Sequence, residues 1–391
     1  MQAVMFSATI PGYLFARTAG RIRREATYGR FGSMRLADVA EPELPGSDWV
    51  AVDVIGSGVC GSDLSVVDYT FSLSLEPFAS FPAVLGHEIL GRVAEVGSAV
   101  SDLEPGRRVA VDPMLSCAVR GHAEWCDACV AGRPAACSRS GRRGVTAIGD
   151  HRLQRGMSVG YHADLPGGFC PRVIAHRSQL HPVPDGLDDT VAVLTEPLSV
   201  AAHGVLQTLP DLEEPVLVIG SGIIALGVVW GLRSAGFEGR IVAQVKREHE
   251  AELARSLGAD ATVRPGTEAV EALLATGASS YRPMLGPDVY AGGGFPVIFD
   301  CVGNQPSLNQ AGRFAAPGGR IVVLGCSAVV PKLDLSFLWS RELRVFGYCG
   351  YGTEQWEGRS RHTYEVTHDW MLENPSGLSA LVTHRFPLTE H

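Results

Sequence analysis

The chain has 391 residues, more than one hydrophobic core usually supports, and 46% of them are hydrophobic, so the sequence predicts a globular protein with two domains. Its 42 acidic residues outnumber its 33 basic residues, and the formal net charge of −9 argues against nucleic acid or a membrane as the main partner, so a small-molecule partner is expected. Nine irregularly spaced cysteines and no apolar signal segment indicate a reducing compartment, and the cytoplasm is the predicted location.

The first 200 residues predict an irregular β-rich domain. Short apolar runs are separated by Gly/Pro turns, as in WVAVDVI from Trp49, EILGRVAEV from Glu88 and CPRVIAH from Cys170. The basic first thirty residues resemble a transit peptide, but we favour an elongated, solvent-exposed hairpin for them.

Strand-like and helix-like segments alternate from about residue 214 onward. The runs VLVIG, RIVAQV, PVIFDCV and GGRIVVLG indicate strands with helices between them, which is typical of a doubly wound parallel sheet. The segment 279–294 is rich in Gly, Pro and Tyr and predicts a surface loop. The expected fold class is therefore α/β, with a nucleotide-binding domain beside the β-rich one.

A glycine-rich turn directly follows the strand VLVIG and precedes a helix. The turn reads Gly220-Ser221-Gly222-Ile223-Ile224-Ala225, which is the context that a dinucleotide-binding fingerprint requires. An NAD site usually has an acid about twenty residues further on, but Lys246 and Arg247 lie there instead. Two cations could neutralise a 2′-phosphate, so we favour NADP over NAD; the alternative is that both side chains only extend into solvent.

Four residues in three separate motifs are candidates for a catalytic metal centre. Cys60 lies in GVCGSDL, His87 and Glu88 are adjacent in GHEILGRVAEVG, and Glu196 precedes a proline in LTEPLSV. Thiolate, imidazole and carboxylate ligands with one position left for water form the ligand set of a catalytic zinc. Cys60 alone would more simply be a buried thiol.

These motifs together resemble the zinc-containing medium-chain dehydrogenase/reductase family, and the resemblance covers nearly the whole chain. The resemblance implies a GroES-like catalytic domain formed by residues 1–200 and 346–391, with a Rossmann domain inserted at 201–345. It also implies that Cys60 and His87 bind zinc, and that Glu88 and Glu196 share the remaining protein position or lie just behind it. Further motifs that carry the resemblance imply more cofactor-binding residues: Cys301, Val302, Gly303, Leu324 and Gly325.

A second, structural zinc is implied by a cysteine-rich segment. Cys126, Cys129 and Cys137 keep the family's spacing, but Ala123 occupies the position where the family has its first cysteine. We favour Cys117 as the fourth ligand of a closed site; His122, Asp127 or an empty site are the alternatives.

The implied activity is zinc-dependent hydride transfer between a secondary alcohol and NADP or NAD. Glu196, in place of the cysteine of simple alcohol dehydrogenases, favours a polyol, a sugar or a related polar alcohol. Ser62 is where the family keeps Ser or Thr to accept the alcohol proton, whereas Ser65 replaces a histidine that continues the relay in many alcohol dehydrogenases. The alternatives are a zinc- and nucleotide-binding redox sensor, and a zinc-free quinone or enoyl reductase.

The resemblance also bears on assembly. The family commonly forms dimers or tetramers, and we expect a homodimer or homotetramer in which the strand ELRVFG could extend a sheet across a two-fold axis. Members of the family usually have a further helix and strand after the position of RFPLTEH, and these complete the catalytic domain. We therefore expect either that the sequence is truncated or that a partner subunit covers the place of this helix and strand.

Overall fold

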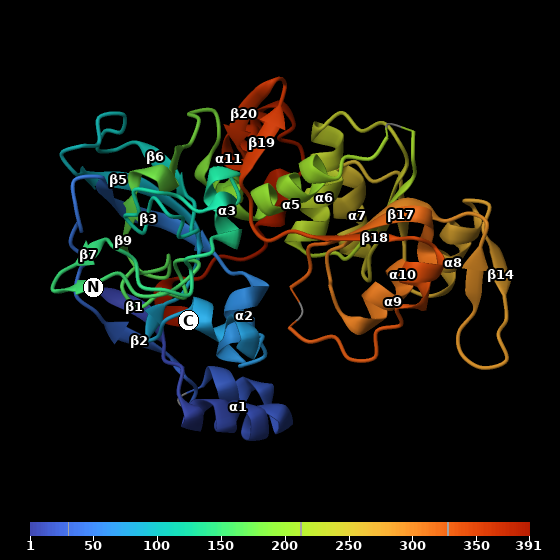
Figure 1. Ribbon diagram of the computed structural model, residues 1–391, viewed down its shortest axis with the longest axis horizontal. Helices are drawn as coiled ribbons and strands as arrows, with labels where there is room; N and C mark the ends of the chain where they lie inside the picture. The colour runs from blue at the N-terminus through green and yellow to red at the C-terminus, as the bar shows by residue number, and fades with distance from the viewer. Residues whose placement is uncertain (30, 212, 327) are drawn as a thin grey trace. The chain divides into compact units, whose positions relative to one another are not determined.

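The computed structural model of the chain describes all residues except Arg30, Leu212 and Ser327 (Figure 1). It contains two compact units. The first unit comprises residues 1–196, 351–368 and 382–391, and the second comprises 197–350 and 369–381. The first is β-rich and the second is an α/β sheet unit, which confirms the predicted fold class.

The first unit is built mainly from antiparallel strands. They form a five-stranded sheet in the order β10-β6-β5-β3-β9, a three-stranded sheet in the order β2-β1-β4, and the pairs β7-β8 and β19-β20. The strands are β1 (Gln2–Phe6), β2 (Met34–Asp38), β3 (Trp49–Gly58), β4 (Ala83–Val84), β5 (Glu88–Val96), β6 (Arg108–Val111), β7 (Ala147–Ile148), β8 (His151–Arg152), β9 (Arg172–His176), β10 (Leu180–Pro182), β19 (Thr353–Trp356) and β20 (Arg359–His362).

Short helices join these strands. The α-helices are α1 (Ile10–Ile22), α2 (Gly61–Val67), α3 (Asp127–Val130) and α4 (Asp189–Ala192), and the 3-10 helices are η1 (Arg24–Tyr28), η2 (Leu73–Phe78), η3 (Pro134–Ala136), η4 (Arg177–Gln179) and η6 (Leu388–Glu390). Helix α5 (Thr195–Gln207) begins in the first unit and continues in the second.

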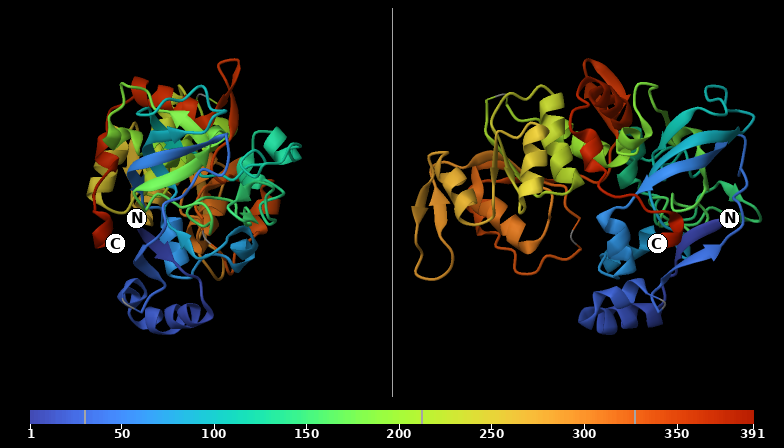
Figure 2. Two further views of the ribbon diagram at one scale, coloured as in Figure 1. Left: turned by 90° about the vertical axis from the view of Figure 1, so that its left-hand side faces the viewer. Right: turned by 180° about the vertical axis from the view of Figure 1, so that it is seen from behind.

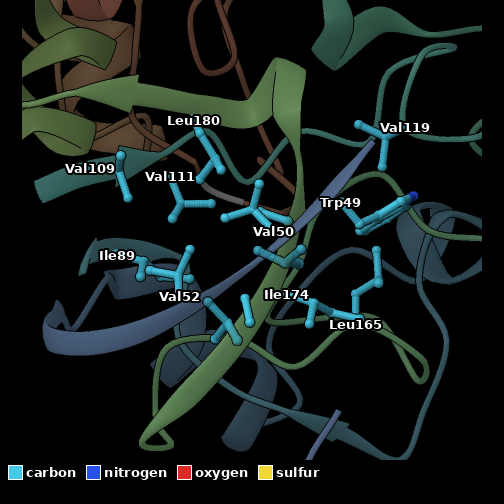
Figure 3. Packing of buried hydrophobic residues seen from close by; sticks show 14 of the residues in the cluster. Trp49, Val50, Val52, Ile89, Val109, Val111, Val119, Leu165, Ile174 and Leu180 are labelled. Carbon is cyan, nitrogen blue, oxygen red and sulfur yellow. The ribbon is translucent and has the colours of Figure 1, made fainter. Parts of the chain in front are cut away.

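The core of the first unit lies against the five-stranded sheet. Figure 3 shows Val50 and Val52 of β3 among side chains from the neighbouring strands, such as Ile89, Val111 and Ile174. Each of these five side chains is at most 3% exposed, and burying an aliphatic side chain stabilises the fold by roughly 1.5–3 kcal/mol. This packing fixes β3 and β5, and both strands lead directly to candidate metal ligands.

The N-terminal segment differs from the predicted hairpin. Strands β1 and β2 do pair antiparallel, but the connection between them contains the helix α1. Thr9 caps this helix by accepting a hydrogen bond from the backbone N–H of Gly12, and Ala16 packs beside Tyr69. Figure 2 shows α1 next to the segment that carries α2 from two directions. The prediction was wrong because the apolar residues of this segment recur at helical spacing, not in alternation.

The second unit has a six-stranded parallel sheet in the order β13-β12-β11-β16-β17-β18, with helices along it (Figure 1). Its strands are β11 (Val216–Ile219), β12 (Ile241–Gln244), β13 (Ala261–Val263), β16 (Phe295–Asp300), β17 (Ala315–Val323) and β18 (Arg344–Gly347), and its helices are α6 (Ile223–Ser234), α7 (Glu248–Ser256), α8 (Thr267–Leu274), α9 (Gln305–Phe314), α10 (Ser336–Ser340) and η5 (Leu378–Leu381).

The segment 279–294 is a hairpin and not the irregular loop that the sequence predicts. Strand β14 (Ser279–Tyr281) pairs antiparallel with β15 (Val289–Ala291). Met284 and Leu285, between the two strands, are 99% and 89% exposed. The strands were missed because each has three residues and no extended alternation of apolar and polar positions.

The helix α11 (Thr363–Glu373) runs from the first unit into the second. Residues 369–381 therefore lie in the second unit, whereas the expected boundary at residue 346 assigns them to the catalytic domain. The reason is the packing of Trp370 against Trp230, with ring centroids 6.0 Å apart, and a hydrogen bond from the Trp230 indole N–H to the carbonyl of Asn374. Among the helices of the described residues, none is long and apolar enough to cross a membrane.

The buried His162 is expected to make the stability of the first unit depend on pH. Its Nδ1 accepts backbone hydrogen bonds from Asp164 and Leu165, and its Nε2 lies 3.1 Å from the carbonyl of Gln154, so the buried ring is satisfied in its neutral form. Burial lowers the pKa of His162 to about 4. The unfolded chain takes up a proton below about pH 6.5, so stability is lost as pH falls from about 6.5 towards 4.

Between pH 7 and pH 5 we expect the unfolding free energy of the wild type to fall by about 1–2 kcal/mol more than that of His162→Gln. Urea unfolding of both proteins at the two pH values measures this difference, with the exposed His249→Gln as the control for losing a histidine. Equal pH dependence in wild type and His162→Gln would contradict the prediction.

Candidate catalytic metal centre and cofactor site

The first candidate site lies at the ends of two paired strands of the first unit. Cys60 follows β3 and is the N-terminal capping residue of α2, and His87 immediately precedes β5. Gly58 pairs with Glu88 across these strands. As a result, ligand atoms of Cys60, His87 and Glu88 all lie within 4.8 Å of one another.

Asp63 holds two parts of this centre in place, although the sequence analysis did not assign it a role. Its Oδ2 accepts the backbone N–H of Cys60 at 3.0 Å, and its Oδ1 lies 3.4 Å from Nδ1 of His87. Because Nδ1 faces this carboxylate, Nε2 is the nitrogen left to bind a metal. A carboxylate behind a ligating histidine fixes the orientation of the ring and its tautomer.

The electrostatics of the centre favour a cation. Burial alone would lower the pKa of His87, but the acidic groups of Tyr161 and Asp63 raise it well above its ordinary value. Burial raises the pKa of Glu88, and burial together with the charge of Glu88 raises the pKa of Glu196 to about 8. Buried acids that resist ionisation next to a histidine that favours a positive charge fit a site for a divalent cation.

The two candidate acids differ in position. Glu88 belongs to the set whose ligand atoms lie within 4.8 Å of one another, whereas Glu196 does not. Glu196 is buried at the start of α5 and close enough to interact electrostatically with Glu88 and His87. The geometry therefore favours Glu88 as the third ligand and Glu196 as a neighbouring carboxyl group.

Ser62 lies beside the centre in a hydrogen-bonded group. The Tyr161 oxygen lies 2.9 Å from Ser62 Oγ, 3.0 Å from Asp63 Oδ1 and 3.3 Å from His87 Nδ1, so its single hydrogen has Ser62 and Asp63 as possible acceptors. Ser65, three residues further along α2, donates its hydroxyl to the carbonyl of Gly61 at 3.0 Å. Ser65 therefore bonds within its own helix and takes no part in this group.

The cysteine-rich segment forms a second candidate metal centre. The Sγ atoms of Cys117, Cys126, Cys129 and Cys137 all lie within 4.8 Å of one another, and among the described residues neither alternative ligand, His122 or Asp127, belongs to that set. Four converging thiols match a closed structural zinc site.

Local hydrogen bonds favour the thiolate form of Cys126, whereas burial raises the pKa of Cys129 and of Cys137. Backbone N–H groups of Cys117 and Cys126 donate to the sulfurs of Cys129 and Cys117, each at 3.4 Å. Burial raises the pKa of Cys126, but hydrogen bonds from Cys129 and Ser138 outweigh it and lower that pKa to about 6. The buried guanidinium of Arg120 also faces the sulfurs. Such surroundings fit a cation held by four thiolates.

The candidate cofactor residues lie at one edge of the parallel sheet in the second unit. Ile219 of β11 pairs with Gln244 of β12 and with Asp300 of β16, and Asp300 pairs with Val323 of β17. The predicted residues follow these strand ends, and ligands of doubly wound sheets bind at that edge. The structure thereby brings together the segments 220–225, 246–247, 301–303 and 324–325.

Two glycines of the predicted turn have distinct roles. Gly220 has φ 131°, which only glycine adopts readily, and it allows the sharp exit from β11. Gly222 is the N-terminal capping residue of α6, and a Cβ placed there would meet no atom within 4 Å. The free space at this helix N-terminus fits an approaching pyrophosphate.

Gly303 and Gly325 serve packing instead. A Cβ on Gly303 would lie 2.3 Å from the carbonyl oxygen of Gly325. Asp300, which the sequence analysis did not single out, accepts the N–H groups of Val302 and Gly303 at 2.9 Å each. These contacts fix the backbone beside the dinucleotide turn.

The charges after β12 include an acid that the sequence analysis missed. Glu250 accepts the backbone N–H groups of Lys246 and Arg247 at 3.0 and 2.9 Å, and its Oε1 lies 3.9 Å from Arg247 Nη1. Burial alone would raise the pKa of Glu250, but hydrogen bonds from the backbone of Lys246 and from the side chain of Ser221 lower it. The signal was available in sequence as the Glu of a helix N-terminal capping box.

A third group of potential ligands, Asp112, His181 and His362, has a structural explanation. The backbone N–H of Tyr364 donates to Nδ1 of His362 at 3.2 Å, so Nε2 carries the proton and faces Asp112 Oδ2 at 3.4 Å. The rings of His181 and His362 stack with centroids 4.1 Å apart. This arrangement explains His362 and Asp112, whereas the buried Nε2 of His181 has no hydrogen-bond partner among the described residues.

Comparisons with known proteins identify the family of the chain. Residues 46–185 match the family described as alcohol dehydrogenase GroES-like domain, and residues 224–363 match the family described as zinc-binding dehydrogenase. The chain is 29% identical to L-threonine 3-dehydrogenase of Saccharopolyspora erythraea over 92% of this chain and 90% of that protein.

Two further similarities add to this. The chain is 30% identical to a diacetyl reductase of the (R)-acetoin-forming type from Saccharomyces cerevisiae, over 74% of this chain and 67% of that protein. A zinc-binding dehydrogenase of Sinorhizobium meliloti 1021, whose structure is bound to NADP, superposes with a TM-score of 0.63 at 27% identity and covers 88% of this chain and 85% of that one. The chain belongs to the zinc-dependent medium-chain dehydrogenase/reductase family, whose members here are NAD(P)-dependent alcohol oxidoreductases.

Proposed function

We propose that the protein oxidises a secondary alcohol with polar neighbouring groups, or reduces the corresponding ketone, with NADP as the preferred cofactor. The observation that carries this proposal is the convergence of Cys60, His87 and Glu88 in front of Asp63, in a chain that also has a dinucleotide-binding turn. One relative's name specifies a hydroxy amino acid and another's specifies acetoin, and both compounds are secondary alcohols with a polar neighbour.

In the proposed mechanism a zinc ion at this centre would supply the positive charge that lowers the pKa of a substrate hydroxyl, and a nicotinamide cofactor would supply the hydride acceptor. Cys60, His87 and Glu88 hold the metal, and Asp63 orients His87. Ser62, whose oxygen is hydrogen-bonded to Tyr161, would accept the hydroxyl proton and at the same time pass its own hydroxyl hydrogen on, so that it stays neutral. Glu196 places a further carboxyl group near Glu88 and His87, and loss of its proton would make the charge of the centre more negative.

We also propose that Cys117, Cys126, Cys129 and Cys137 hold a second, structural zinc. Support comes from the mutual approach of the four sulfurs and from the lowered pKa of Cys126. Metal at a closed site of this kind contributes to folding stability and not to the reaction.

A homo-oligomer that acts in the cytoplasm is part of the same proposal. Strand β18 lies at the edge of the six-stranded sheet and pairs only with β17 among the described strands, and Val345 on it is 51% exposed. An exposed edge of this kind can pair with the same edge of a second copy. Sedimentation velocity, which should give the mass of at least two chains, checks the assembly, and cell fractionation checks the location.

The proposed activity predicts how the wild type and a metal-ligand variant turn over alcohols. With a panel of polyols, sugars, hydroxy amino acids and simple secondary alcohols, the zinc-loaded wild type should raise the absorbance at 340 nm in the presence of NADP. Cys60→Ala should lower kcat by at least about a thousandfold, because no thiolate remains to hold the metal. It should bind NADP as the wild type does, since Cys60 and the dinucleotide turn belong to different units.

Cys170→Ala is the matched control, because Cys170 is a buried thiol in the core cluster of the same unit. A wild type that binds zinc and NADP but oxidises no alcohol on the panel would favour the redox-sensor alternative over an enzyme.

A second prediction concerns cofactor choice. Lys246→Ala/Arg247→Ala should raise the KM for NADP about tenfold or more and change the KM for NAD little, because only NADP carries the 2′-phosphate. Steady-state kinetics with both cofactors at low and high salt measure this. Arg255→Ala, on the last turn of helix α7, which follows Lys246 and Arg247, is the control. An equal rise for both cofactors would contradict the assignment and leave Glu250 as the residue that selects the ribose.

A further inference from the structure

We infer that Tyr161 is a positioning residue for the Ser62 hydroxyl, which it holds in the orientation needed to exchange a proton with the substrate oxygen. The inference rests on the proposed function and assigns a role to a residue outside the metal-ligand and glycine-rich motifs. Tyr161 lies in the segment 160–169, almost a hundred residues from Ser62 in sequence.

The contacts of the Tyr161 oxygen support this role. It lies within hydrogen-bond distance of three groups of the centre: Ser62 Oγ at 2.9 Å, Asp63 Oδ1 at 3.0 Å and His87 Nδ1 at 3.3 Å. One hydroxyl therefore connects the proton-accepting serine, the carboxylate behind the histidine, and the histidine itself.

The number of hydrogens on these groups limits which of them can donate each hydrogen bond. A phenol has one hydrogen to donate and two lone pairs. When Nε2 of His87 binds the metal, its Nδ1 carries a hydrogen and can donate it to Asp63 or to Tyr161. Tyr161 can then donate its hydrogen to Ser62, in competition with the Asp63 carboxylate 3.0 Å away; this bond fills one lone pair of Ser62 Oγ and leaves the other lone pair for the substrate proton. A hydroxyl that accepts one hydrogen bond is a stronger donor of another.

The surroundings of Tyr161 make it a rigid support. Its ring packs on the aromatic cluster that includes Phe6, Val66 and Tyr69, and its carbonyl accepts the backbone N–H of Ser80 at 3.0 Å. Val66 belongs to α2, the same helix as Ser62, so the support and the supported hydroxyl are fixed to each other. A hydroxyl on a packed ring loses little freedom when it bonds.

The residue in the place of the relay histidine gives Ser62 no support. Ser65, which occupies that histidine's place, uses its hydroxyl on the Gly61 carbonyl. Among the described side chains, Tyr161 is the neighbour to which Ser62 Oγ is hydrogen-bonded. Orientation of Ser62 therefore depends on Tyr161 and not on the next turn of α2.

The test is a double-mutant cycle on the zinc-loaded protein with the best substrate of the panel. Tyr161→Phe should lower kcat about tenfold while changing KM less than about twofold, since one hydrogen bond to the reacting serine is lost and the substrate contacts remain. Adding Tyr161→Phe to Ser62→Ala should cause less than about a twofold further loss, because no hydroxyl is left to position. In the Ser62→Thr protein, which has a hydroxyl at this position, adding Tyr161→Phe should again lower kcat about tenfold.

Zinc content, NADP affinity and the melting temperature of each variant are measured beside turnover, and Tyr161→Phe should leave all three near the wild-type values. Tyr69→Phe is the matched control, because Tyr69 packs in the same aromatic cluster and bonds to Ser33 and Thr9. The same loss from Tyr161→Phe with and without the Ser62 hydroxyl would overturn the inference, and so would loss of zinc from Tyr161→Phe. An inactive wild type would refute the proposed function and the inference with it, whereas additive losses in an active enzyme would refute the inference alone.

Discussion

The candidate catalytic centre depends on the pairing of Gly58 with Glu88 at the ends of β3 and β5. A Cβ on Gly58 would lie 1.8 Å from Glu88 Oε2, so only glycine leaves room for this carboxylate. The buried apolar side chains of β3 and β5 hold the two strands in register. The register in turn brings Cys60, just after one strand, next to His87, just before the other. A shift of one residue would turn Glu88 to the opposite face of the sheet and separate the ligands.

Charge supports the proposal that these residues hold a metal. His87 favours a positive charge in its acidic surroundings, while the carboxyl groups of Glu88 and Glu196 resist ionisation because they are buried. A divalent cation would relieve both effects, since it substitutes for the proton on His87 and stabilises the carboxylates. In the four-cysteine group, backbone N–H groups donate hydrogen bonds to the sulfurs of Cys117 and Cys129. A cation would likewise neutralise the negative charge of thiolates at these positions. Without a bound cation, both proposed zinc sites therefore lack a positive charge to balance their carboxylates or thiolates.

The sequence predicted those parts of the fold and site that depend on short, local patterns. The alternation of strands and helices after residue 214 predicted the parallel sheet, and the spacing of Cys126, Cys129 and Cys137 predicted the sulfur cluster, which Cys117 joins. Long-range contacts were not accessible in this way. The choice between Glu88 and Glu196 depends on strand register, and the contact of Tyr161 with Ser62 joins residues almost a hundred positions apart. Helix α1 is different, because the helical spacing of its apolar residues is a local signal that the predicted hairpin did not take into account.

The metal content of the purified protein tests the central claim most directly. Zinc per chain is measured by plasma emission spectrometry for the wild type, Cys60→Ser and Cys126→Ser. The account predicts two zinc ions per chain in the wild type and one in Cys60→Ser, which should keep the wild-type melting temperature. Cys126→Ser should lose the other ion and melt at a lower temperature, because the closed site stabilises its loop. Equal zinc content in the wild type and Cys60→Ser would contradict the account, because Cys60 would then hold no metal.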